Sequence, residues 1–89
     1  MQKNHSTAHL RRIDAERNMR RFYAASIQPT LFGEVSVVRN WGRIGTAGRM
    51  QLETFHEPVQ AEEAFLKLVR FKQRRGYESR AEEPISDQT

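Results

Sequence analysis

The sequence predicts an α+β domain, a small antiparallel β-sheet with one long C-terminal helix packed across one face. Three observations predict this class: strand-forming segments fill the first part of the chain, a segment of helical period follows them, and 89 residues suffice for one domain with a modest core. A helix with a single apolar stripe must cover a sheet face to bury that stripe. The opposite face of the sheet is then expected to remain open for solvent or a partner.

Strand signals precede residue 56. The clearest lie in "MRRFYAASI" and "EVSVVRNW", which are rich in strand formers and joined by a segment containing Pro and Gly, so that they predict a hairpin. In "RMQLETF" apolar and polar residues alternate, which predicts a third antiparallel strand after the glycine-rich turn. The short "HLRRI" is expected to form an edge strand and "DAERN" a loop. Strands are therefore predicted at residues 9–13, 19–27, 34–41 and 49–55.

A single helix is predicted over residues 58–77, where apolar side chains recur at the i, i+3, i+4, i+7 spacing of one helical face. Pro58 suits the first turn, and Gly76 is a stop signal. The basic residues of "KQRRGY" complement the negative end of the helix dipole, and would add a phosphate contact if they lie beside Arg43. Five large apolar residues are assigned to the core: Phe22, Phe32, Phe55, Phe65 and Leu68.

The predicted domain spans residues 9–77. Residues 1–8 are polar and residues 78–89 are charged or small, so that a disordered N-terminus and a disordered acidic tail are expected on either side. No segment has the apolar character of a membrane span or of a signal peptide. The chain has no cysteine, which excludes disulfides and thiolate chemistry and fits a reducing compartment. A cytoplasmic protein without a membrane partner is therefore expected.

The charge distribution favours a polyanionic partner. Residues 1–49 contain nine Lys and Arg against three Asp and Glu, whereas residues 50–89 contain six against eight. Twelve of the fifteen basic residues are arginine, whose planar guanidinium group suits bidentate contact with phosphate and stacking on rings. A basic surface of this kind is typical of nucleic-acid-binding proteins, although it also occurs simply as a solvated surface.

The segment "RNWGRIGTAGR", residues 39–49, holds the only tryptophan and three of the five glycines. On a pleated strand Arg39, Trp41 and Arg43 point to the same side. Two guanidinium groups beside an indole suit the grip of a nucleic-acid end or nick, with arginine on phosphate and the indole against an exposed base or sugar. The glycines, Gly42 among them, would let the backbone approach a bulky ligand. Their spacing, followed by a strand, does not match a phosphate-binding loop.

This segment resembles the signature of the WGR domain, named for the tripeptide Trp41-Gly42-Arg43. The similarity extends over residues 9–77: "NMRRFYAASI" looks like the strand before the signature, and "AEEAFLKLVRFKQRRGY" looks like the closing helix. WGR domains in DNA-damage-responsive poly(ADP-ribose) polymerases bind DNA at strand breaks. The resemblance therefore implies that Trp41 packs against a sugar-phosphate end, that Arg43 contacts phosphate or a neighbouring domain, and that Arg39 contacts phosphate.

The chain departs from those polymerases because it contains neither their catalytic domain nor their zinc fingers, so that a stand-alone, bacterial WGR protein is expected. No cofactor is expected. His5, His9 and His56 make neither a metal site nor a catalytic set, and no enzyme is predicted. Three roles for the Trp–Arg face stay open: DNA binding at ends or nicks, contact with another protein, since Trp and Arg are frequent in interface hot spots, and a purely structural cap on the core.

Overall fold

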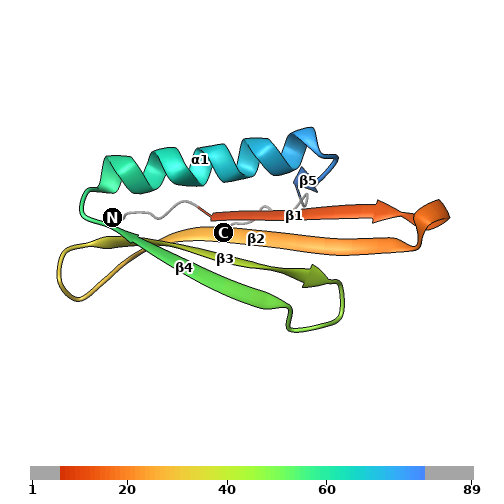
Figure 1. The fold of residues 1–89 in the computed structure, drawn as a ribbon, viewed down its shortest axis with the longest axis horizontal. Helices are drawn as coiled ribbons and strands as arrows, with labels where there is room; N and C mark the ends of the chain where they lie inside the picture. Colours follow the sequence, from red (N-terminus) through yellow and green to blue (C-terminus); the bar gives the residue numbers. More distant parts are fainter. Residues whose placement is uncertain (1–6, 80–89) are drawn as a thin grey trace, which may run out of the picture.

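The computed structural model describes residues 7–79 as a five-stranded antiparallel sheet with one helix across one face (Figure 1). The strand order is β4-β3-β2-β1-β5. The predicted α+β class is thus confirmed. The elements are β1 (Thr7–Asp14), a 3-10 turn (Ala15–Arg17), β2 (Met19–Pro29), β3 (Val35–Arg43), β4 (Arg49–Phe55), α1 (Pro58–Arg74) and β5 (Glu78–Ser79). The helix, as described, is too short and too polar to span a membrane.

The sheet reaches two residues beyond each predicted domain boundary. Thr7 and Ala8 belong to β1, and Glu78 and Ser79 form β5, which pairs with Leu10 and Arg11 of β1. Because β5 lies outside β1, the segment expected as an edge strand is an inner strand along part of its length. The remainder of the two predicted disordered ends, residues 1–6 and 80–89, lies outside the described part of the chain.

The helix ends in a hydrogen-bonded reversal that returns the chain to the core. Gly76, at φ +96°, donates its N–H to the carbonyl of Gln73, and Tyr77 donates to that of Lys72. This pair of bonds is the Schellman motif, in which glycine takes the left-handed position that other residues avoid. As a result the ring of Tyr77 is buried against Tyr23, with their centroids 6.4 Å apart.

Strand register decides which side chains the helix covers. Tyr23, Ala25 and Ile27 of β2 are buried beneath α1, and their partners on β3 are Trp41, Arg39 and Val37. Antiparallel partners point to the same side of a sheet, so the Trp–Arg face lies on the helix side. The sheet face that was expected to remain open for a partner is therefore the other one, and it does not carry the Trp–Arg face. On the helix side Arg39 and Trp41 are partly buried and Arg43 is exposed. Figure 1 shows that β3 ends about level with the last turn of α1, whereas β1 and β2 continue beyond it.

The core is built from both layers: Leu10, Tyr23, Ala25, Ile27, Val37, Ala61, Phe65 and Tyr77. Of the phenylalanines assigned to it, Phe65 is buried and Phe55 packs partly against it. Phe32 is 87% exposed, which corrects its assignment. The β2–β3 loop explains the difference, since its own hydrogen bonds from Thr30 to Glu34 and from Phe32 to the Thr30 hydroxyl close it at the end of the sheet.

The two phenylalanines provide a matched test of the core. Phe65→Ala should lower the free energy of unfolding by about 3–5 kcal/mol, because it opens a cavity under α1. Phe32→Ala should change it by less than about 0.5 kcal/mol, because the ring is already in solvent. Urea denaturation of both variants checks the prediction, and equal losses would contradict this placement of the two rings.

A second prediction concerns the β3–β4 turn. A Cβ atom on Gly48, at φ +73°, would collide with the carbonyl oxygen of Trp41 and lie 2.8 Å from the ring of Phe22. Gly45, in the same turn at φ +97°, has nothing within 4 Å of such an atom. Both substitutions by alanine incur backbone strain, but Gly48→Ala should cost at least about 1 kcal/mol more because it also overpacks the turn. Thermal or urea unfolding of the pair gives that difference, which vanishes if the turn is loosely packed.

Candidate nucleic-acid interface

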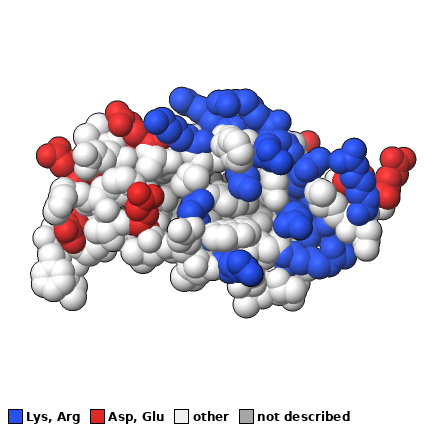
Figure 2. Space-filling view, in the orientation of Figure 1, with Lys and Arg blue, Asp and Glu red and all other residues white. Residues whose placement is uncertain are grey.

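Lysine and arginine side chains gather at one end of the molecule. Figure 2 shows them from the middle of the molecule to the half that holds the last turns of α1, whereas acidic side chains lie mainly toward the opposite end, with a few among the basic ones and at the tip of the basic half. The charge difference that the sequence shows between its two halves therefore becomes a difference between two ends in space. The helix contributes to it because its basic C-terminal half lies at the same end as the arginines of the strands.

Trp41 lies within this basic end. The indole is partly buried and packs on the core through Tyr23, with ring centroids 6.4 Å apart and planes inclined by 30°. The guanidinium carbon of Arg39 lies 5.4 Å from the centre of the indole, a cation–π distance. Arg39 also donates a hydrogen bond to Oε1 of Gln51 on β4. The indole thus packs against Tyr23, and Arg39 lies over its ring while Gln51 of β4 holds the guanidinium group in place.

Arg43 shares the face of Trp41, as predicted, but it is bound to the β1–β2 turn. Its Nη1 and Nη2 lie 3.3 and 3.4 Å from the backbone and side-chain oxygens of Asn18. Asn18 adopts a left-handed conformation, which suits the tight turn after the 3-10 segment. The side chain remains exposed, so these weak hydrogen bonds orient the guanidinium group without removing it from solvent.

Gly42 lies in a close backbone contact within the turn, and its approach to a ligand stays a prediction. A Cβ atom at Gly42 would lie 2.8 Å from the Cα atom of Gly48, and 3.5 Å from the ring of Phe22. The glycines thus let the backbone approach itself, where the sequence suggested the approach of a ligand. Asn40 closes the same turn by donating to the carbonyls of Ala47 and Arg49, at 3.2 and 2.7 Å.

Lys72, which the sequence analysis considered only as part of the basic helix end "KQRRGY", belongs to the site. Its Nζ lies 4.9 Å from the ring centre of Tyr23 and 5.2 Å from that of Tyr77. Burial lowers its pKa below 10.5, and the cations of Arg75, Arg21 and Arg39 lower it further. A phosphate contact from this helix end was expected only if it lies beside Arg43. The structure brings it to Arg39 and to Arg21, which is the cross-strand partner of Arg43.

We call these side chains the basic cluster: Arg21, Arg39, Arg43, Lys72 and Arg75, around Tyr23 and Trp41. None of the five cations forms an ion pair with a carboxylate within residues 7–79, where the ion pairs are Arg17 with Asp14 and His56 with Glu34. Within the described part of the chain, no ion pair therefore offsets the positive charge of the cluster. Of the other histidines, His5 lies outside the described residues, and His9 lies on the opposite face of the sheet.

Comparison with known proteins agrees with the motif. A sequence model of the WGR domain matches residues 6–84. An uncharacterized protein of Sinorhizobium fredii, y4dW, is 46% identical over 76 residues, which make up 85% of this chain and 37% of that protein. The chain thus spans little more than a third of the length of this relative. No solved structure matches the chain.

The environment of Lys72 predicts a measurable titration. NMR of the lysine ε-methylene groups should give Lys72 a pKa below 10.5, and Arg75→Ala should raise it because a neighbouring cation is removed. Between the folded-state pKa and 10.5 the unfolded chain binds more protons, so stability should rise with pH across this window. Lys72→Gln should abolish that rise. A Lys72 midpoint at or above 10.5 would contradict the burial and the repulsion described here.

Proposed function

Because this chain belongs to the WGR domain family, a family of nucleic-acid-binding modules, we propose that it binds DNA, with a preference for ends or nicks, through the basic cluster. In this proposal Arg39 and Arg43 contact phosphate, as do Lys72 and Arg75, while Trp41 lies against the sugar or base at the interruption. Gly42 acts indirectly, by holding the turn that carries Trp41 and Arg43.

A single observation carries the proposal: cations from β2, β3 and α1 gather beside Tyr23 and Trp41, and none of them forms an ion pair with a carboxylate of the described residues. Bringing like charges together opposes folding unless another interaction compensates. A polyanion supplies such an interaction, since phosphate groups bind the cations and release counterions from the nucleic acid. Arginine, which contributes four of the five cations, is the side chain best suited to these contacts.

The preference for interruptions follows from the indole. Trp41 packs on Tyr23 and is covered on its ring by Arg39, so that only a limited part of it is accessible. In an intact duplex the base faces are stacked on one another and offer no surface to such a ring. At an end or a nick a base or sugar face becomes accessible, and contact with an aromatic side chain then adds to the phosphate contacts.

A protein partner on the same face is the second candidate. Tryptophan and arginine are enriched in interface hot spots, and pre-oriented side chains lose less entropy on binding. The hydrogen bonds of Arg39 to Gln51 and of Arg43 to Asn18 give this kind of pre-orientation. A protein ligand would carry acidic side chains to match the cluster, and it would not distinguish nicked from intact DNA.

The test compares a sealed DNA dumbbell with the same dumbbell carrying one nick, by fluorescence anisotropy at two salt concentrations. The nicked form should bind more tightly. Trp41→Ala should reduce that preference by about 5-fold or more, the lower end of the range for a base–aromatic contact. Arg39→Gln and Lys72→Gln should weaken binding to both forms and lower the slope of log K against log salt by nearly one each.

Arg70→Gln is the matched control, because it removes one exposed charge from α1 outside the cluster. It should change affinity much less than Lys72→Gln. Unfolding curves of each variant establish that the fold is retained. Equal affinity for sealed and nicked DNA, unchanged by Trp41→Ala, would reject DNA-break binding and favour the protein partner.

A further inference from the structure

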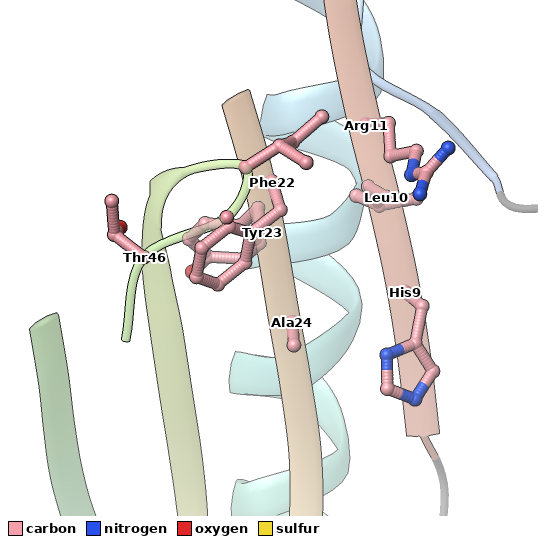
Figure 3. Close-up of a pocket in the computed structure, with 9 residues that line it drawn as sticks. His9, Leu10, Arg11, Phe22, Tyr23, Ala24 and Thr46 are labelled. Carbon is pink, nitrogen blue, oxygen red and sulfur yellow. The ribbon is translucent and has the colours of Figure 1, made fainter. Parts of the chain in front are cut away.

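A pocket of about 220 Å³ lies on the sheet face opposite the helix, at the basic end of the molecule. Figure 3 shows its lining: His9 and Arg11 extend from β1 on one side, Phe22 and Thr46 lie on the other, and the small side chain of Ala24 lies between. A second, shallow hollow adjoins it along β2 and shares His9 and Ala24 with it. Neither hollow has a carboxylate in its lining.

Strand register explains why this face is hollow. Ala24 lies between His9 on β1 and Asn40 on β3, so a methyl group stands between two longer side chains. Ser26, the next residue of β2 on this side, is also small and continues the depression. Small residues along a central strand, bordered by larger ones on its neighbours, leave a trough that follows the strand.

The ring of Phe22 is held in position by the glycine turn. Its cross-strand partner is Gly42, and its ring contacts the positions where Gly42 and Gly48 lack side chains. Ile44, whose N–H donates to the carbonyl of Arg20 at 2.8 Å, fixes the turn against β2 and brings Thr46 to the mouth of the pocket. The aromatic wall is therefore built by the fold and does not depend on a ligand to order it.

The opposite wall supplies charge and hydrogen-bonding groups. Arg11 and His9 are exposed and lie two residues apart on β1, which places them on the same side of the sheet. The cross-strand partner of Arg11 on its outer side is Glu78 of β5, and no salt bridge joins the two. The combination of an aromatic ring, a guanidinium group, an imidazole and a hydroxyl group around a narrow hollow matches the chemistry of a nucleobase with its phosphate.

Position links this pocket to the basic cluster. Arg43 ends β3 on the helix side, and the next residues, Ile44 to Thr46, line the pocket on the other side. One turn therefore separates the two surfaces. A strand of DNA that leaves a duplex at the basic cluster needs only to pass around this turn to bring its first unpaired nucleotide to the hollow.

We propose that the pocket between Phe22, Arg11 and His9 binds an unpaired nucleobase, so that the module contacts duplex DNA with its helix side and a single strand with its opposite face. This inference rests on the proposed function for its biological setting, but the pocket can be tested alone. The base stacks against Phe22, the adjacent phosphate pairs with Arg11, and His9 and Thr46 offer hydrogen bonds to the edge of the base.

The experiment titrates the ¹⁵N-labelled protein with a single-stranded DNA tetranucleotide, and then with one whose second nucleotide is abasic. The amide signals of Ala24, Gly45 and Thr46 should shift with the intact oligonucleotide. Removal of the base should weaken binding by about 5-fold or more, because the ring contact is lost while the phosphates remain. Ala24→Leu, which fills the pocket, should abolish the difference between the two oligonucleotides. Arg11→Ala removes a phosphate contact common to both, so it should weaken the binding of both by a similar factor.

Arg70→Ala serves as the charge-matched control for Arg11→Ala and should change both affinities much less. Equal affinity for the two oligonucleotides overturns the proposal, as do signal shifts confined to residues of the basic cluster. The two proposals can fail separately. If the amide shifts depend on the base but the protein does not prefer nicked duplex, the pocket proposal stands and the proposed function is rejected. If the protein prefers nicked duplex but the amide shifts do not depend on the base, the proposed function stands and the pocket proposal is rejected.

Discussion

The contact between the backbones of Gly42 and Gly48 determines the geometry of both candidate surfaces. Because neither residue has a side chain, the backbone at Gly48, at the end of the β3–β4 turn, can approach the backbone at Gly42 closely. The ring of Phe22 packs against both residues. This close approach fixes the direction of Trp41 and Arg43 on one side of the sheet. It also fixes Phe22 and Thr46 on the other. A larger residue at Gly48 would displace the carbonyl of Trp41, and with it the position of the indole.

The second constraint is electrostatic. The Schellman turn at Gly76 buries Tyr77 next to Tyr23, and the side chain of Lys72 then lies over both rings. The rings favour the ammonium group, yet burial and three nearby guanidinium groups oppose it, and the pKa falls. The folded protein therefore holds a cation in an unfavourable field. Any anion that approaches this region relieves the repulsion as it binds, which makes the same residues costly for folding and favourable for association.

Much of this architecture follows from local patterns. The hairpin, the third strand and the helix start at Pro58 were predicted because alternation, turn residues and helical period act over short segments. The pleat also placed Arg39, Trp41 and Arg43 together. The side of the sheet that the helix covers could have been predicted from β3 itself. Val35 and Val37 are an even number of residues from Trp41 and point to the same side, so apolar residues on that side indicated that it faces the core. By contrast, β5 has two residues, and pairing with β1 alone defines it. Lys72 joined the cluster because α1 docks on the sheet with this side chain over Tyr23, and no local pattern encodes that tertiary contact.

The separation of charge between the two ends gives the molecule a permanent electric dipole along its length (Figure 2). In the field of a polyanion, a protein with this charge distribution experiences a torque before contact. The torque turns its basic end toward the polyanion, so that a larger fraction of collisions occurs in that orientation. The other end then points away. It carries Leu31 and Phe32, which are 95% and 87% exposed at the tip of the β2–β3 loop. Such an orientation would keep this apolar tip away from the polyanion.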